Sequence, residues 1–209
     1  MTERKETTAG LILMAGASSR MGTPKALLKI GKKTMVEHIL DEALKSDLDR
    51  VILVVASLDG EMGAILVPYE QNRKFRVVEN RRSREGMGSS IIAGLDAVSE
   101  ECGHIMVILG DMPGVDAHII NHLLDGYLAS HKNMGAITVG RKRSHPVIFS
   151  RDRYGDLRKL RGDRGARGLL DGHEEEVCLV NAPSAYDDRD MDTPEDYRAF
   201  WGNQEGKGR

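Results

Sequence analysis

The stretch Leu11-Ile-Leu-Met-Ala-Gly-Ala-Ser-Ser-Arg-Met-Gly-Thr-Pro-Lys25 decides the fold class of this chain. Its first part is a short apolar run that predicts a buried strand over 11–15, and its second part is a loop of small residues with two cations. In an open α/β sheet, ligands bind beyond the carboxyl ends of the strands, where this loop would lie. Glycine allows close approach of the backbone, and exposed N–H groups with nearby cations suit a triphosphate.

Two common phosphate-binding loops do not fit this stretch. A P-loop has four residues between its glycines and then a lysine, whereas five residues separate Gly16 from Gly22 and Thr23 follows. The dinucleotide fingerprint requires glycine at the position of Ser18. The loop is therefore of a different kind.

The rest of the chain alternates short apolar runs with helical patterns. Further strands are expected at 51–56, 75–78, 105–109, 136–139 and 177–180, and apolar helix faces at 35–44, 91–98 and 119–124. Several runs are continuous, which is typical of strands covered on both faces. The pattern predicts a three-layer α/β/α, Rossmann-like fold with a mostly parallel sheet. We expect one domain over 1–209, with flexible tails at 1–9 and 202–209.

The composition narrows the function classes. The chain has 209 residues, of which 40% are hydrophobic and 30% charged, and its formal net charge of -2 gives no general attraction to nucleic acid or membrane. The polar start does not resemble a signal peptide, and no apolar run approaches the ~20 residues that span a bilayer. With two cysteines and no CxxC pair, the sequence predicts a cytoplasmic protein with reduced thiols.

The pattern of Gly16, Arg20, Gly22, Pro24 and Lys25 resembles the signature loop of the nucleotidyltransferases that include sugar-phosphate and molybdenum-cofactor nucleotidylyltransferases. This resemblance implies that the loop wraps the NTP phosphates and that Arg20 and Lys25 are catalytic cations, with Lys25 stabilising charge at the α-phosphorus. The nucleotide contacts that it implies in this stretch are Leu13, Ala15, Gly16, Ser18, Ser19, Arg20, Gly22 and Lys25.

Two acidic segments are candidates for a magnesium site. Asp111 follows a predicted strand, where it can also be a turn residue. Asp192 lies in Asp190-Met-Asp-Thr-Pro-Glu-Asp196, where Asp192 or Thr193 can cap a helix. The resemblance implies that Asp111 and Asp192 bind Mg²⁺, with Asp190 as an alternative to Asp192.

The segment Gly86-Met-Gly-Ser-Ser-Ile-Ile-Ala-Gly-Leu95 opens a predicted helix with free N–H groups and hydroxyls. Gly88, Ser89 and Ser90 could simply form a helix cap. The resemblance implies instead that they contact the nucleobase, with Ser90 the best match and Asn80 a further candidate.

The second half of the chain indicates the branch of the family. His145-Pro-Val-Ile-Phe149 and Leu160-Arg-Gly-Asp-Arg-Gly-Ala-Arg-Gly-Leu169 resemble molybdenum cofactor cytidylyltransferases. The resemblance implies that this half, with His145 and Arg167, faces a molybdopterin-type acceptor. Ala15, where a guanylyl enzyme would carry glycine, favours CTP. A surface helix hairpin with solvated arginines is the alternative.

The resulting hypothesis is a Mg²⁺-dependent transfer of CMP from CTP to the terminal phosphate of a molybdopterin-type cofactor, with pyrophosphate released. The product would be available for delivery to a molybdenum enzyme, and neither nucleic acid nor membrane is an expected partner. The alternatives are a guanylyltransferase or sugar-phosphate nucleotidylyltransferase of the same fold, or a non-catalytic nucleotide-binding or cofactor-delivery module. Asp190-Met-Asp192 also has the D-x-D form of glycosyltransferases, but the Lys25 loop argues against that reaction.

Overall fold

Seven strands form one sheet in the order β5-β4-β1-β6-β8-β7-β9. The structure is a computed structural model, and it describes residues 7–16, 24–98, 102–163 and 165–205. The strands of the sheet are β1 (Thr7–Met14), β4 (Arg50–Val55), β5 (Phe75–Glu79), β6 (Cys102–Leu109), β7 (Met134–Val139), β8 (Lys142–Ser150) and β9 (Val177–Asn181). Only β8 pairs antiparallel with its neighbours in this sheet, so the prediction of a mostly parallel sheet is confirmed. A separate ribbon pairs β2 (Lys29–Ile30) with β3 (Lys33–Thr34).

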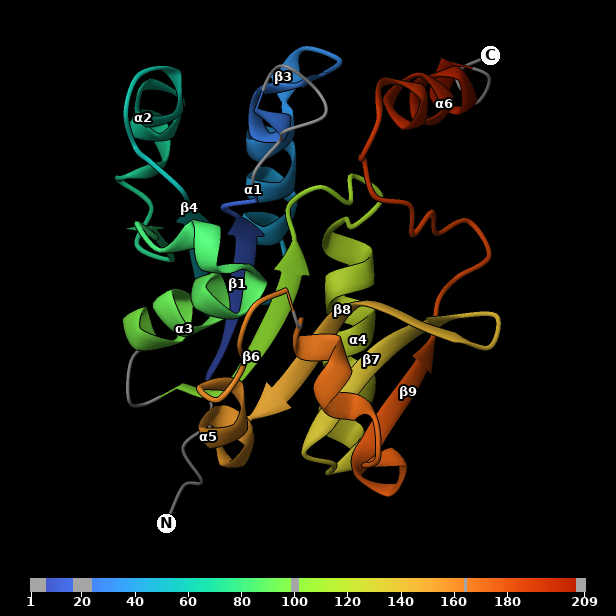
Figure 1. The fold of residues 1–209 in the computed structure, drawn as a ribbon. Helices are drawn as coiled ribbons and strands as arrows, with labels where there is room; N and C mark the ends of the chain where they lie inside the picture. Colours follow the sequence, from blue (N-terminus) through green and yellow to red (C-terminus); the bar gives the residue numbers. More distant parts are fainter. Residues whose placement is uncertain (1–6, 17–23, 99–101, 164, 206–209) are drawn as a thin grey trace.

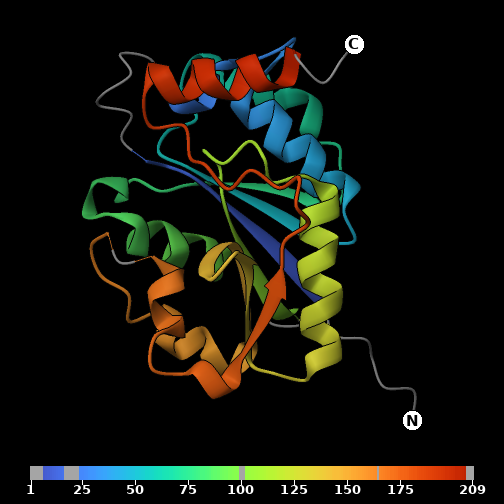
Figure 2. The same cartoon turned by 90° about the vertical axis from the view of Figure 1, so that its right-hand side faces the viewer.

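Helices cover both faces of the sheet (Figures 1 and 2). They are α1 (Met35–Lys45), α2 (Glu61–Leu66), α3 (Met87–Ala97), α4 (Ala117–Ser130), α5 (Tyr154–Leu157) and α6 (Pro194–Glu205). Short 3₁₀ turns are η1 (Lys25–Leu27), η2 (Val67–Tyr69), η3 (Ser83–Glu85), η4 (Arg151–Arg153), η5 (Ala166–Leu170) and η6 (Glu174–Glu176). Figure 2 shows α1 and α4 on one side of the sheet and α3 and α5 on the other, which confirms the three layers.

The central strands bury side chains on both faces, which explains their continuous apolar runs. Along β1, Ile12 packs into the core under α1 and α4, whereas its neighbours Leu11 and Leu13 pack into the core under α3. Helix α1 turns its apolar face to the first of these cores, and it starts with a capping box. The Glu37 carboxylate accepts the Thr34 N–H at 2.7 Å, and the Thr34 hydroxyl accepts the Glu37 N–H at 3.4 Å.

Strand β8 was not predicted, because a proline inside an apolar run argues against a strand. In the structure Pro146 lies at an irregularity. The pairing of β8 with β7 passes from Val147 directly to Ser144, so His145 and Pro146 are extra residues on β8. Proline is tolerated at such a bulge, and the segment lies inside the sheet between β6 and β7, so the alternative of a surface helix hairpin over it is wrong.

Both predicted tails need correction. Strand β1 begins at Thr7, so 7–9 belong to the sheet, and α6 continues to Glu205, so 202–205 are helical. Both cysteines are free. Within the described residues, none of the helices combines the length and apolar character that crossing a membrane requires.

Candidate active site

A cavity of about 640 Å³ opens where β1, β4 and β6 end and α3 begins. This volume lies within the ~300–1,000 Å³ typical of small-ligand sites. The lining residues come from both the predicted site and other segments: Leu13, Met14, Ala15, Gly16, Pro24, Lys25, Ala26, Leu27, Val55, Ala56, Ser57, Asp59, Glu61, Met62, Ser83, Arg84, Gly86, Met87, Ser90, Leu109, Asp111 and Asp163. The cavity lies at the sheet edge where a parallel fold places its ligand.

Lys25 joins three distant segments at one end of this cavity. Its Nζ donates to Asp111 Oδ2 at 3.0 Å and also to Asp192 Oδ1. Burial alone would lower the pKa of Lys25, but its hydrogen bonds and charge interactions with Asp192 and Asp111 outweigh burial and raise it. Lys25 is therefore a fixed positive charge at neutral pH.

The C-terminal segment carries Asp192 across the end of β6. The Met191 N–H donates to the Asp111 carbonyl at 2.8 Å, which holds the two segments together. The Met191 side chain is 1% exposed and packs with Ile30, Met35 and Phe200, so α6 is tied to the ribbon and to α1. The packing of Met191 therefore fixes the position of Asp192 beside Asp111.

Thr193, not Asp192, caps α6. The Thr193 hydroxyl accepts the Asp196 N–H at 3.1 Å, and Asp196 Oδ2 accepts the Thr193 N–H at 2.8 Å. The Asp192 carboxylate is directed to Lys25 instead. Partial burial, followed by the negative charges of Asp192 and Asp111, raises the pKa of Asp190.

The side chains of Asp111 and Asp192 have the donor chemistry that a magnesium ion requires. Carboxylate oxygens are the hard donors that Mg²⁺ prefers, and protein sites often supply one or two of them while waters and substrate phosphates supply the rest. No group of three or more His, Cys, Asp or Glu side chains suited to a metal occurs in the described ranges. Two carboxylates of this kind would leave the other positions around such an ion to water and substrate.

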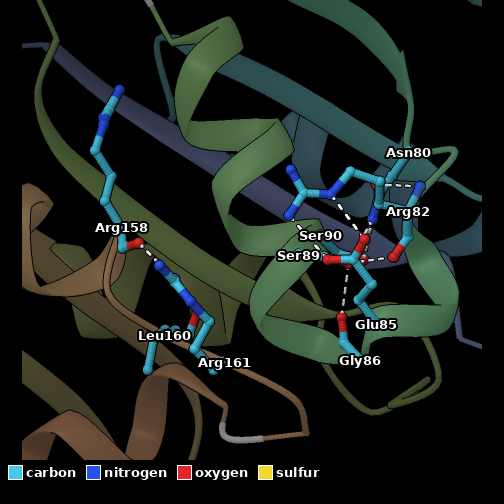
Figure 3. A network of polar contacts seen from close by, with 9 residues as sticks. All are labelled: Asn80, Arg82, Glu85, Gly86, Ser89, Ser90, Arg158, Leu160 and Arg161. Carbon is cyan, nitrogen blue, oxygen red and sulfur yellow. Dashed lines mark hydrogen bonds and ion pairs between the residues drawn. The ribbon is translucent and has the colours of Figure 1, made fainter.

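The predicted base contacts divide into one cavity residue and several supporting ones. Asn80 is buried, and its Nδ2 donates to the hydroxyl oxygens of Ser89 at 2.9 Å and Ser90 at 3.0 Å (Figure 3). The Ser89 hydroxyl lies within hydrogen-bond distance of the Arg82 and Gly86 carbonyls. Of these predicted residues, only Ser90 lines the cavity. Asn80 and Ser89 connect the η3 segment to the start of α3, and the Gly88 N–H donates to the Gly162 carbonyl.

The other predicted nucleotide contacts can be placed in part. Leu13, Ala15, Gly16 and Lys25 line the cavity. Ser18, Ser19, Arg20 and Gly22 lie outside the described residues.

Sequence reasoning missed further residues that line the cavity. Ser57, Asp59 and Glu61 follow β4, whose carboxyl end neighbours that of β1, and this adjacency was the available signal. Asp163 also lines the cavity, although its segment was expected to face the acceptor.

The two predicted acceptor-side residues lie outside the cavity lining. His145 is 5% exposed on β8, and its carbonyl accepts the Tyr186 hydroxyl at 2.7 Å. Burial, and then the positive charge of Arg167, lowers the pKa of His145 to about 4. Its Nδ1 has no hydrogen-bond partner among the described residues. Arg167 is exposed and donates to the Arg143 carbonyl at 3.3 Å.

Comparison with known proteins identifies relatives over most of the chain. Residues 10–177 match the MobA-like NTP transferase domain. Nicotine blue oxidoreductase from Paenarthrobacter nicotinovorans is 30% identical over 194 residues, which cover 89% of this chain and 92% of that protein. Purine catabolism protein PucB from Bacillus subtilis is 29% identical over 196 residues, with 90% and 93% covered.

Solved structures match as well. The crystal structure of Rv0371c from Mycobacterium tuberculosis has a TM-score of 0.80 and 26% identity, and covers 95% of this chain and 100% of that chain. A complex of the same protein with manganese has a TM-score of 0.75 and 26% identity, with 92% and 97% covered.

Proposed function

Because the chain belongs to the family of MobA-like NTP transferase domains and is a nucleotidyltransferase, we propose that it transfers CMP from CTP to the terminal phosphate of a molybdopterin-type cofactor. The observation that carries this proposal is the placement of Lys25 between two carboxylates at the edge of a nucleotide-sized cavity. Hydrogen bonds on two sides hold this cation at the edge of the cavity, where it can stabilise developing phosphate charge.

Asp111 and Asp192 are the residues that would hold Mg²⁺. When bound, this ion would supply positive charge for the triphosphate. Both carboxylates form ion pairs with the Lys25 ammonium group, so Mg²⁺ and Lys25 would act on the same phosphates. The manganese complex of the Rv0371c protein supports a divalent cation in this family.

The reaction needs positioning more than proton transfer. An oxygen of the acceptor phosphate forms a bond to the α-phosphorus of CTP, and the bond from the α-phosphorus to the oxygen that bridges it to the β-phosphate breaks, which releases pyrophosphate. The attacking oxygen is already anionic at neutral pH, so no general base is required. Lys25 contributes by holding the phosphates in line and by stabilising charge that develops at the α-phosphorus.

The choice of CTP is supported by Ala15, which lines the cavity where glycine would leave more room. The choice of a molybdopterin-type acceptor is supported by the resemblance of the segments that contain His145 and Arg167. A guanylyltransferase of the same fold is the nearest rival, and it differs in the base rather than in the chemistry.

The proposal is tested by pyrophosphate release with each of four NTPs against a panel of phosphorylated acceptors that includes molybdopterin. We expect release with CTP and molybdopterin, and loss of release when Mg²⁺ is chelated. Release only with GTP would overturn the cytidylyl assignment, and release only with sugar phosphates would overturn the acceptor. No release with any pair would overturn the proposed activity.

A further inference from the structure

The loop over 161–163 lies against the start of α3 through backbone contacts. The Gly88 N–H donates to the Gly162 carbonyl at 3.0 Å. A side-chain carbon at Gly86 would lie 2.4 Å from the Gly162 carbonyl carbon, and one at Gly88 would lie 3.0 Å from that of Leu160. These glycines therefore allow the two segments to meet without an intervening side chain.

The residue before this loop is also fixed. The Leu160 side chain is buried, and its carbonyl accepts a hydrogen bond from Arg161 Nη1 at 2.8 Å (Figure 3). The same nitrogen donates to the Arg158 carbonyl at 3.0 Å. The guanidinium group of Arg161 thus bonds to two carbonyls that precede it in the chain, and these bonds fix the backbone that leads to Asp163.

This arrangement brings an unpaired carboxylate to the nucleotide cavity. Asp163 lines the cavity, and its Oδ1 would lie 2.7 Å from a side-chain carbon at Gly86. In the part of the chain that the structure describes, no hydrogen bond or ion pair engages this carboxylate. An ionised carboxylate can only accept hydrogen bonds, so it offers an acceptor to the ligand.

Ser90 supplies the complementary group on the same wall. Its hydroxyl oxygen accepts from Asn80 Nδ2 at 3.0 Å, so the hydroxyl proton can be donated into the cavity. Asp163 and Ser90 lie at the α3 end of the cavity, whereas Lys25 and Asp111 mark the phosphate end. The base of a bound nucleotide would therefore meet an acceptor and a donor.

We propose that Asp163 selects the nucleobase by accepting a hydrogen bond from its exocyclic amino group, while Ser90 donates to a ring acceptor. This inference rests on the proposed function. Cytosine presents the amino group at the position where uracil presents a carbonyl oxygen, which a carboxylate repels. Guanine also presents N–H groups that a carboxylate can accept. Asp163 therefore separates cytosine from uracil by hydrogen bonding, and Ala15 separates cytosine from guanine by size.

The test compares the binding of CTP and UTP, which differ mainly in this one group. Dissociation constants are measured by titration calorimetry with Mg²⁺ present for the wild type, Asp163→Asn, Asp163→Ser and the control Asp59→Asn. Asp59 lines the same cavity, but its Oδ2 already accepts the Ser57 hydroxyl at 2.8 Å. The control therefore removes an equal charge from the same cavity without removing the unpaired acceptor.

We expect the wild type to prefer CTP by about 10–150-fold, the range for a hydrogen bond to a charged group. Asp163→Asn should reduce this preference at least tenfold, because the amide can donate to the uracil carbonyl, and Asp163→Ser should reduce it less. Asp59→Asn should keep it. A ratio within about threefold of wild type in both Asp163 variants, or an equal change in Asp59→Asn, would overturn the assignment.

The binding ratio is independent of turnover. An enzyme that binds CTP over UTP in the expected way but releases no pyrophosphate would contradict the proposed function and leave the role of Asp163 supported. Turnover with CTP, together with an unchanged CTP-to-UTP binding ratio in the Asp163 variants, would support the proposed function and contradict the role of Asp163.

Discussion

Lowering the pH from 7 to 5 should destabilise the protein through His145. This histidine is buried, and its Nδ1 has no hydrogen-bond partner among the described residues, so the charged form is strongly disfavoured in the folded state. Burial, followed by the charge of Arg167, lowers its pKa from 6.5 to about 4. Between these two values the unfolded chain binds the proton and the folded protein does not, so stability is complete above pH 6.5 and is lost as the pH falls towards 4.

The size of this effect follows from the two pKa values. Each pKa unit corresponds to ~1.36 kcal/mol, so a fall from 6.5 to about 4 corresponds to about 3 kcal/mol in total. Most of it, about 2 kcal/mol, should be lost already at pH 5, because the unfolded histidine is then almost fully protonated. This loss is a large part of the ~5–15 kcal/mol that holds a typical domain together.

The assay is urea denaturation at pH 7 and pH 5 for the wild type, His145→Gln and His118→Gln. His118 is exposed on α4 and serves as the matched control. The difference in unfolding free energy between the two pH values should shrink by about 2 kcal/mol in His145→Gln and stay unchanged in His118→Gln. Equal pH dependence in all three proteins, or a His145 ring that titrates near pH 6.5 by NMR, would refute the reasoning.

The remaining predictions concern the reaction. Lys25→Ala should lower turnover by about 10²–10³, as removal of one preorganised charge contact does, while the control Lys33→Ala on the nearby ribbon should stay within about threefold of wild type. A Lys25→Ala enzyme with near-wild-type turnover and unchanged circular dichroism would contradict the catalytic role of Lys25. Asp111→Asn and Asp192→Asn should each raise the Mg²⁺ concentration needed for activity. Because the two acids share one cation, the loss of transition-state stabilisation in the double variant should be less than the sum of the two single losses, and fully additive losses would place them in separate roles. We expect the wild type to prefer CTP over GTP by roughly 10–200-fold, the effect of a group the size of a methyl, and Ala15→Gly to reduce this preference. If the ratio of kcat/KM values for CTP and GTP is unchanged in Ala15→Gly, Ala15 does not determine the selectivity.

The fold could be predicted because it depends on local patterns. Continuous apolar runs indicated strands covered on both faces, and the helix faces at α1, α3 and α4 followed the helical period. Strand β8 was missed because its local sequence, with Pro146 and several polar residues, does not look like a strand. Pairing on both sides by β6 and β7 outweighs that local preference, and the irregularity at His145 and Pro146 accommodates the proline.

The site could be predicted where residues follow strand ends. Lys25 and Asp111 follow β1 and β6, whose carboxyl ends are adjacent in a parallel sheet. Asp163 follows no strand, and its place in the cavity depends on the backbone contact between Gly88 and Gly162. A sequence pattern does not reveal such a contact between distant segments.

Met14 shows how the role of a residue can depend on contacts with distant segments. It is the last residue of β1, the strand that leads into the signature loop. In the structure the Met14 side chain lies beside Gly110, where a side-chain carbon would be 2.5 Å from the Met14 Cε, and packs against the cluster that contains Met191. The methionine therefore helps to support the segment that carries Asp192.

The most direct test of the proposed reaction follows the α-phosphorus itself. CTP labelled with ³²P at the α-position is incubated with enzyme, Mg²⁺ and molybdopterin, and the products are separated while pyrophosphate is counted. We predict that the label appears in the acceptor product in equal amount to the pyrophosphate released, and that omission of the acceptor abolishes both. Label that stays in CTP, or that appears only as free CMP, would contradict nucleotidyl transfer by this protein.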